Sequence, residues 1–521
     1  MDASLALTLF LFVSLATFLM MGYPVALTLA GVSLITATLG MVLYEFFGVS
    51  VGVLDWGYVG LFPQRIFGVM TNEVLLAVPL FIAMGVMLEK SRVAEDLLDA
   101  MGRLFGKRRG GLGIAITVVG ALLAASTGIV GATVVTMGLI SLPTMLKRGY
   151  SPSFAAGSIA AAGTLGQIIP PPIVLVLLGD VMSSAYQQAQ RDMGIFSPEP
   201  MSVGDLFAGA FLPGLMLVGL YILYQVGIAI FKPAHCPAYV EDETDTSRIL
   251  PLILKAMLPP LVLIVAVLGS ILSGIATPTE AASVGAVGAI LLGSLRLSDT
   301  TPKIVIYGLL SLAGLVVLTR SGLSGGLYIG LAALLVTTFV MGLINALMVV
   351  YKTGVLHDVM DSTVKISTMI FVILIGAALF SLVFRGLGGD DYVADILAAL
   401  PGGKWGALVA VMLVMFVLGF FLDFIEITFV VVPIVAPILL TMGINPIWLG
   451  VMMAMNLQTS FLTPPFGFAL FYLRGVAPES VATPMIYKGV IPFIIIQIFA
   501  LVLLSLYPEI ATWLPSVMFK G

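Results

Sequence analysis

The chain has 521 residues, of which 60% are hydrophobic and 10% are charged. A soluble domain carries about 25% charged residues, so the composition excludes a soluble globular protein and indicates a polytopic membrane protein. The net charge of −4 is too small and scattered to indicate a nucleic-acid partner. The single cysteine, Cys236, excludes an internal disulfide framework or a cysteine-rich metal site.

The N-terminal region reads as a series of apolar segments followed by a basic one. Apolar spans are expected at residues 4–21, 24–44 and 74–89, with a loop or interfacial helix over 45–72. Six lysine and arginine residues then lie between Lys90 and Arg109. By the positive-inside rule this basic segment faces the cytoplasm.

Residues 111–146 are apolar but interrupted near the middle, at Ser126–Gly131. Each half has about 15 residues, too few to cross about 30 Å of hydrocarbon at 1.5 Å per residue. Because Lys147 and Arg148 close a segment that also begins beside basic residues, both of its ends are expected in the cytoplasm. The pattern favours a re-entrant helical hairpin with its tip near the midplane; one kinked span plus an interfacial helix is the alternative.

The next apolar segment, residues 151–180, is also interrupted. Gly163-Thr164-Leu165-Gly166 leads to Pro170-Pro171-Pro172, and proline cannot continue a regular helix. Irregular backbone at membrane depth is tolerated only where it lines a site or is buried in protein. We therefore expect a broken transmembrane helix, interrupted over residues 163–172.

The middle of the chain alternates polar loops and apolar spans. Loops are expected at residues 181–204 and 232–250, spans at 205–231, 251–273, 280–295 and 366–384, and an extra helix pair at 304–350. Gly386–Asp395 is glycine-rich and acidic and is expected on the outer face. Glu280 follows Thr277-Pro278-Thr279, where a carboxylate caps a helix start; capping is favoured there over a functional role.

Residues 421–467 repeat the pattern of residues 126–172. Five prolines or glycines recur at one offset (437 − 143 = 294), namely Pro143/Pro437, Gly149/Gly443, Pro152/Pro446, Pro170/Pro464 and Pro171/Pro465. A second hairpin is expected over 405–441 with its break at Asp423, followed by a helix over 446–473 broken at 458–467. Acidic residues flank this hairpin where basic ones flank the first, so the repeats should be inverted across the membrane.

A broken helix exposes free carbonyls at one half-helix end and free N–H groups at the other, which suit a dehydrated cation and an anionic group. Sodium is a hard cation that prefers oxygen ligands. The first sodium site is expected to draw on Ser126, Thr127, Gly128, Gly163, Thr164, Gly166, Ile168 and Pro170. The second is expected to draw on Asp423, Gln458, Thr459, Ser460 and Thr463, and substrate is expected to contact Thr127, Thr164 and Thr459.

Asp423 is the sharpest single prediction, because an ionisable side chain inside a membrane segment indicates function. Two alternatives stay open. The carboxylate could lie at a water-exposed loop end, or Glu426, three residues on, could be the ligand with Asp423 its neighbour. Enzyme motifs such as G-x-S-x-G, H-E-x-x-H and Walker A are absent from the sequence, so we expect neither an enzyme nor a bound cofactor.

Five segments between about Leu75 and Gly467 carry a family likeness: GTLGQIIPPP, KRGYSPSFAAG, ATPTEAASVG, LLAVPLFIAMG and FLDFIEITFVVVPIVAP. Together they resemble the large membrane subunit (DctM-like) of tripartite ATP-independent periplasmic (TRAP) transporters, within the ion-transporter superfamily. The resemblance implies an elevator transporter of the bacterial inner membrane that imports an organic acid with sodium. It also implies a small four-helix membrane subunit and a periplasmic substrate-binding protein as partners.

The resemblance places the sodium sites on Ser126, Gly128, Gly166 and Pro170, and on Asp423, Thr459 and Thr463. Residues 1–110 and 181–404 would form scaffold helices, residues 111–180 and 405–475 the two transport-domain repeats, and residues 476–521 a C-terminal helix. A self-sufficient sodium/carboxylate symporter or antiporter of the same superfamily is the alternative, and a non-transporting scaffold or an enzyme is less favoured.

Overall fold

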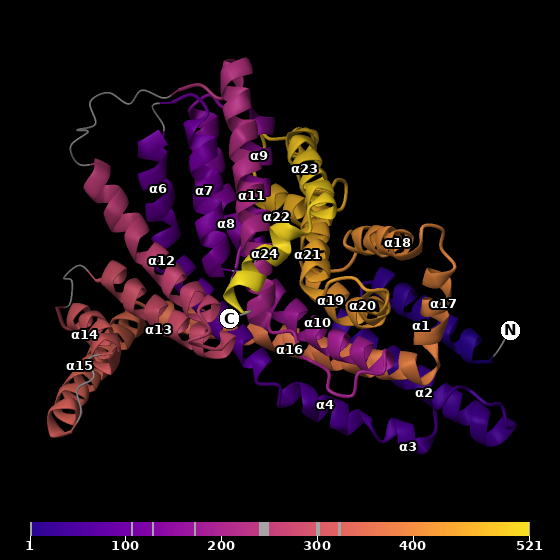
Figure 1. The fold of residues 1–521 in the computed structure, drawn as a ribbon. Coiled ribbons are helices and arrows are strands. Elements are labelled where there is room, and N and C mark those ends of the chain that lie inside the picture. Colours follow the sequence, from indigo (N-terminus) through magenta and orange to yellow (C-terminus); the bar gives the residue numbers. More distant parts are fainter. Residues whose placement is uncertain are drawn as a thin grey trace.

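The computed structural model of the chain describes residues 3–105, 108–127, 130–170, 173–238, 249–298, 303–320 and 325–519. Within these ranges every regular element is a helix, α1–α24 with three short 3-10 helices η1–η3 (Figure 1). Eight of the described helices are long and apolar enough to cross a membrane, and up to eleven spans result if each bent helix pair counts as one. The expected all-α polytopic membrane protein is confirmed.

The N-terminal elements follow the expected spans closely. They are α1 (Ala3–Met20), α2 (Val25–Phe47), α3 (Trp56–Val59), α4 (Phe62–Met70), η1 (Val74–Leu76), α5 (Ala77–Lys90) and α6 (Val93–Phe105). The mixed stretch 45–72 holds two short helices, α3 and α4. Asp55 caps α3, since the Tyr58 N–H donates to Asp55 Oδ1 at 2.7 Å. Helix α2 packs along α16, beside the second half of the chain.

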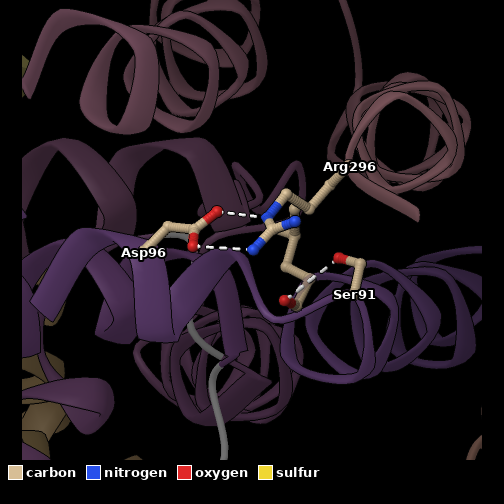
Figure 2. A network of polar contacts seen from close by, with 4 residues as sticks. Ser91, Asp96 and Arg296 are labelled. Carbon is tan, nitrogen blue, oxygen red and sulfur yellow. Dashed lines mark hydrogen bonds and ion pairs between the residues drawn. The ribbon is translucent and has the colours of Figure 1, made fainter. Parts of the chain in front are cut away.

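Helix α6, in the basic segment, is tied to α13 (Pro278–Leu297). Figure 2 shows Arg296 of α13 reaching Asp96 of α6 with both prongs of its guanidinium. Arg296 Nη2 donates to Asp96 Oδ1 at 3.0 Å, and Arg296 Nε donates to Asp96 Oδ2. Ser91, just before α6, donates its hydroxyl to the Leu88 carbonyl at 3.2 Å. A two-pronged pair fixes orientation as well as distance, so α6 is anchored to the α5–α13 pair.

The first repeat contains two packed arms, called hairpin 1, and a broken helix. Its elements are α7 (Gly111–Thr127), α8 (Val130–Lys147), α9 (Pro152–Thr164), η2 (Leu165–Gln167) and α10 (Ile173–Asp192). With 17 and 18 residues, α7 and α8 are longer than expected, so length alone does not separate a hairpin arm from a span. Helices α7 and α8 contact each other, and both lie along α9, as the two arms of a hairpin would.

The second repeat has the same parts in the same order. Hairpin 2 is α18 (Gly403–Leu418), α19 (Phe424–Val430) and α20 (Val432–Thr441), and its broken helix is α21 (Pro446–Leu462) and α22 (Phe468–Val476). The expected break at Asp423 is confirmed. The second arm also bends by 55° between α19 and α20, which was not expected. Pro433, in the first turn of α20, lacks the N–H that would continue the arm's helical hydrogen bonding.

Equivalent residues of the repeats hold equivalent structural positions. Helices α8 and α19 begin 294 residues apart (424 − 130 = 294). Pro152 and Pro446 stand in the first turns of α9 and α21. Gly149 and Gly443 end the preceding arms at φ of 79° and 82°, the left-handed conformation that glycine adopts without steric cost. The recurring prolines and glycines are therefore helix starts and helix ends of one architecture used twice.

The two repeats also exchange contacts. Helix α8 of hairpin 1 packs on α22 of the second broken helix, and α20 of hairpin 2 packs on α10 of the first. Helices α9 and α21 contact each other between them. Reciprocal packing of this kind follows from a two-fold relation between the halves, as inverted-repeat transporters have. The expected pair of inverted repeats, each with a hairpin and a broken helix, is confirmed.

The remaining helices are α11 (Val203–Phe231), η3 (Pro233–His235), α12 (Ile249–Leu272), α13, α14 (Lys303–Arg320), α15 (Gly326–Lys352), α16 (Val355–Gly386), α17 (Gly389–Ala398), α23 (Thr483–Leu506) and α24 (Glu509–Met518). The extra pair expected at 304–350 is present as α14 and α15. The C-terminal region holds two helices where one was expected. Most of the central loop 232–250 lies outside the described residues.

Two stretches expected as loops are instead largely helical. The first half of the expected loop 181–204 belongs to α10, and most of Gly386–Asp395 belongs to α16 and α17. In α10, Ser184, Gln187 and Gln188 line a cavity, so their low hydropathy reflects a helix that faces a polar space. In α17, Asp390 stands in the first turn, where the helix dipole favours negative charge.

Candidate functional site

The flanks of the first hairpin tip lie directly on the first break. A Cβ at Gly163 would come within 2.3 Å of Val134 Cγ2, so glycine is required where α8 crosses the end of α9. The side chains of the predicted site residues Ser126 and Thr127, and Gly128 as a whole, lie outside the described part of the structure. For the first predicted sodium site, the structure therefore describes the residues of the broken helix, 163–170, but not the ligands expected at the hairpin tip.

The first break is a tight turn between α9 and α10. The N–H groups of Ile168 and Ile169 both donate to the Leu165 carbonyl at 3.1 Å, which bends the chain out of the α-helix. The Ile168 carbonyl oxygen lies near α11, since a Cβ at Gly214 would lie 3.5 Å from it. The other predicted residues of this turn are all buried: Gly163, Thr164, Gly166 and Pro170.

At the second hairpin tip, two carboxylates cap the same helix start. Asp423 Oδ1 accepts the Phe424 N–H at 2.7 Å, and Glu426 Oε2 accepts the Asp423 N–H at 3.0 Å. This reciprocal arrangement is a capping box. Glu426 is only 7% exposed. Both charges therefore meet the positive end of α19, and Asp423 has a structural partner besides any ion it binds.

Glu280 offers a comparison, because it belongs to a capping box without a nearby break. Thr277 Oγ1 accepts the Glu280 N–H at 3.3 Å, and Glu280 Oε2 accepts the Thr277 N–H at 2.8 Å. Glu280 is exposed. The expected capping role of Glu280 is confirmed, and it shows what a carboxylate cap looks like when solvent can reach it.

The second tip folds back onto the second break. A Cβ at Gly419 would come within 2.1 Å of Ser460 Oγ. The rings of Phe424 and Phe461 lie 6.4 Å apart, and Phe461 belongs to the last turns of α21. The structure thus brings Asp423, between Gly419 and Phe424, to the predicted residues Gln458–Thr463.

The hydroxyl groups at both breaks share one orientation. Each donates its hydrogen to a carbonyl of its own helix: Thr164 to Ala161 at 2.9 Å, Thr459 to Met455 at 2.8 Å, Ser460 to Leu457 at 2.8 Å and Thr463 to Thr459 at 2.7 Å. With the hydrogen committed to the helix, the oxygen lone pairs remain to accept hydrogen bonds or to coordinate a cation.

The two breaks meet at residues that the repeat makes equivalent. Gln458 Nε2 donates to Thr164 Oγ1 at 3.5 Å, and these residues are separated by 294 positions, the offset of the repeat. Equivalent residues touch only where a two-fold axis passes between them. Thr164 and Gln458 are both fully buried, so the axis runs through the interior at the point where α9 and α21 break.

Gln167 is a polar residue of the first break that sequence reasoning missed. It is 0% exposed, and neither Oε1 nor Nε2 has a hydrogen-bond partner among the described residues. Burying an unpaired polar group costs about 1–3 kcal/mol, so an orphaned amide at this depth points to water or a ligand in the turn. The sequence signal is a glutamine between the glycines and the prolines of GTLGQIIPPP, a polar side chain inside an otherwise apolar segment.

The arrangement offers two kinds of chemistry. Helices α9 and α21 end at the breaks, so their last carbonyls carry partial negative charge that suits a cation. Helices α10 and α22 begin beyond the breaks, so their first N–H groups suit an anionic group. Hydroxyl lone pairs, the orphaned Gln167 amide and the carboxylates of hairpin 2 add side-chain ligands to this centre.

Comparison with known proteins gives a consistent result over nearly the whole chain. The family model described as "Tripartite ATP-independent periplasmic transporter, DctM component" matches residues 12–317 and 300–510. A C4-dicarboxylate TRAP transporter large permease protein of Vibrio cholerae is 30% identical, over 85% of this chain and 86% of the relative. A protein of the same description from Rhodobacter capsulatus is 27% identical, over 97% and 100%.

A solved structure shares the fold. The crystal structure of the Alcanivorax borkumensis YdaH transporter superposes with a TM-score of 0.55 at 16% identity, covering 93% of this chain and 96% of that one. The relatives are transporter permeases and not enzymes. Taken with the membrane-spanning helices, these matches make the chain a multi-pass protein of the bacterial inner membrane. The chain belongs to the family of DctM components, the large permease subunits of tripartite ATP-independent periplasmic transporters.

Proposed function

We propose that this permease uses a sodium gradient to import an organic acid that a periplasmic binding protein delivers. The relatives are named for C4-dicarboxylates, isethionate, ectoine and sialic acid. All four carry a carboxylate or sulfonate group, which supports an acidic substrate class for this chain. The observation that carries the proposal is the meeting of the two broken helices at Thr164 and Gln458.

Sodium would be held by oxygen ligands at each break. The first site would use Ser126, Gly128, Gly163, Gly166, Ile168 and Pro170, joined by the orphaned amide of Gln167. The second would use Asp423, Gln458, Thr459, Ser460 and Thr463. The donor set fits a hard cation, because the hydroxyl hydrogens point back into the helices and leave lone pairs free. Bound sodium would supply positive charge beside Thr127, Thr164 and Thr459, where the acid group of the substrate would bind.

The coupling follows from electrostatics. An isolated carboxylate at the bilayer centre costs roughly 2.5–3.5 kcal/mol on insertion scales, and the anionic substrate meets the same penalty. Cations at the two breaks would offset both charges, so the loaded centre would cross the membrane more readily than a partly loaded one. Glu426, capped against Asp423, would tune the second site by adding negative charge.

The movement would be an elevator. Residues 111–180 and 405–475 interlock through α8 with α22 and α20 with α10, which supports treating them as one moving body. The helices of residues 1–110 and 181–404 would form the scaffold, anchored at α6 and α13 by Asp96 and Arg296. Because the family is tripartite, the scaffold would bind a small four-helix membrane subunit, with the binding protein docking from the periplasm.

Uptake in proteoliposomes tests the proposal. The large and small subunits are reconstituted together, and radiolabelled substrate is supplied on the periplasmic binding protein. We expect uptake with an inward sodium gradient and none when choline replaces sodium at fixed pH. Uptake that is equal in the two salts would exclude sodium coupling. Full uptake without the other two components would favour a self-sufficient symporter.

A further inference from the structure

A large cavity lies away from the two breaks. It has a volume of about 820 Å³ and lies between α4, α10, α16 and hairpin 2, within the range of about 300–1,000 Å³ typical of ligand pockets. Helix α10 leaves the first break and runs away from the basic segment, so its last turn, with Arg191, marks the opposite side of the molecule (Figure 1). With the basic segment in the cytoplasm, as the positive-inside rule predicts, this places the cavity on the periplasmic side.

The charged residues that line this cavity are mostly arginines. They come from three different helices: Arg65 from α4, Arg191 from α10 and Arg385 from α16, with Asp180 of α10 the one lining carboxylate. Arg65 and Arg191 are exposed. Neither has a carboxylate within ion-pair distance in the part of the chain that the structure describes.

The one lining carboxylate is engaged elsewhere. Both oxygens of Asp180 accept from Asn72 Nδ2 at 3.1 Å, so Asp180 does not pair with a lining arginine. Arg385 is partly neutralised, since its Nε lies 3.4 Å from Asp390, which is not a lining residue. Its Nη2 donates to the Pro433 carbonyl at 3.1 Å. Arg65 and Arg191 thus leave the cavity with uncompensated positive charge.

The walls of the cavity belong to two bodies. Helices α4 and α16 lie in the proposed scaffold, whereas Pro433 lies in the proposed moving body. Helix α10 begins in the moving body and runs unbroken past the boundary expected at residue 180, so the whole helix is grouped with the moving body here. Polar groups of α10 complete its lining, including Ser184, Gln187 and Gln188. Any ligand held here would contact both bodies on the side from which substrate arrives.

We propose that this cavity is a receiving site for the organic anion, in which Arg65 and Arg191 bind its acid group before it reaches the broken helices. The planar guanidinium fork suits carboxylates and sulfonates, and a cleft lined by one sign of charge concentrates oppositely charged ligands. The identification of the anion as cargo depends on the proposed function. The cationic character of the site does not.

Cysteine labelling measures that character directly. Ser184→Cys is made in the full chain with Cys236→Ser, and the purified protein reacts with an anionic methanethiosulfonate (ethylsulfonate) or a cationic one (ethyltrimethylammonium). Ser50→Cys, exposed and outside the cavity, is the reference. We expect the anionic-to-cationic rate ratio at Ser184→Cys to exceed the reference by at least about threefold, since unit charges some 8 Å apart interact appreciably even in water.

Charge variants show whether the arginines cause the preference. Arg65→Gln with Arg191→Gln should return the ratio to the reference value, whereas the matched change Arg108→Gln, on the basic cytoplasmic side, should leave it unchanged. Arg65→Lys keeps the charge and should keep the ratio, which separates a charge effect from misfolding. Equal ratios at Ser184→Cys and Ser50→Cys, or a ratio that survives the double change, would overturn the proposal.

Protection by a probe anion completes the test. At constant ionic strength, succinate should slow labelling at Ser184→Cys by at least about twofold, and neutral succinamide should not; the Arg65→Gln, Arg191→Gln variant should lose this protection. Equal protection by the two compounds would contradict anion binding. No gradient or partner is needed, so a failure of sodium-driven uptake would refute the proposed function while this result stood on its own.

Discussion

The two hairpin tips use the same backbone architecture with different charges. Hairpin 1 has a second arm of one uninterrupted helix, and the positions equivalent to Asp423 and Glu426 are Ile129 and Ala132. Hairpin 2 has two carboxylates at its tip and an arm bent by 55°. The two repeats thus share the positions where helices end, because these positions set the shape of the centre, while the charge at each helix end differs.

The two breaks should therefore bind cations in different ways. At the first, neutral oxygens and the Gln167 amide would supply the ligands, and no carboxylate lies among the predicted residues. At the second, Asp423 and Glu426 add negative charge, which the N-terminal end of α19 partly stabilises. Substitutions confined to one tip or one break should therefore have different effects on sodium binding.

The largest effect is expected at the close approach between tip and break. Gly163→Ala should destabilise the protein by about 1–3 kcal/mol, because the new Cβ overlaps Val134 and forces α8 away from α9. Thermal unfolding in detergent measures this change. Gly219→Ala is the matched control: it lies within α11 with open space around it and should be neutral or slightly stabilising. A stable Gly163→Ala protein would show that hairpin 1 does not pack as described.

Gln167→Leu should separate function from stability. The change removes an orphaned buried amide, so unfolding stability should stay the same or rise by about 1 kcal/mol. Uptake should fall by tenfold or more, because the first break loses its side-chain ligand. Transport and thermal unfolding are measured on the same preparation. Normal uptake by Gln167→Leu would remove Gln167 from the site.

Asp423→Asn should shift the sodium dependence of uptake to higher concentration by about tenfold, equivalent to about 1.4 kcal/mol. Asparagine still caps a helix well, so the protein should insert and assemble. Glu280→Gln alters an equivalent capping box far from any break and should leave the sodium curve unchanged. If Glu426→Gln moves the curve and Asp423→Asn does not, Glu426 is the ligand. If neither does, the second site uses neutral oxygens.

The smallest effect on transport is expected from single cysteines that report on which side of the membrane the ends of hairpin 1 lie. These variants should leave uptake intact. The reporters are Arg109→Cys and Lys147→Cys, each made in a Cys236→Ser background. Arg109 and Lys147 are exposed and lie at the two ends of hairpin 1. Native Cys236 is buried, and burial raises the pKa of its thiol, so it reacts slowly in any case. Both labels should react from the cytoplasmic side. Reaction from opposite sides would make the segment a spanning helix.

Much of this architecture was readable from the sequence because glycine and proline act locally. Gly149 and Gly443 mark helix ends through their positive φ, and Pro152 and Pro446 mark helix starts. Asp423 stood out because a carboxylate in an apolar run has few explanations. These signals predicted the repeat, the two hairpins, the tip of the second hairpin and both broken helices.

The features that the sequence did not predict depend on tertiary contacts, which hydropathy does not reflect. Residues 181–192 looked like a loop because Ser184, Gln187 and Gln188 are polar, yet they lie on a helix that faces a cavity. The orphaned state of Gln167 and the pairing of Thr164 with Gln458 exist only once the two halves are packed together. The bend between α19 and α20 was not predicted, because Pro433 in an apolar run can lie inside a continuous arm or begin a new helix, and here it stands in the first turn of α20.

We propose that each break holds a sodium ion, one beside neutral oxygens and one beside a carboxylate. Thermal unfolding of the purified protein across a sodium titration, with choline keeping ionic strength constant, tests it most directly, since a ligand of the folded state stabilises by mass action. We predict that sodium raises the midpoint, and that Asp423→Asn leaves a smaller rise that Gln167→Leu in the same chain abolishes. Equal midpoints in sodium and choline for the unmodified protein would contradict the account.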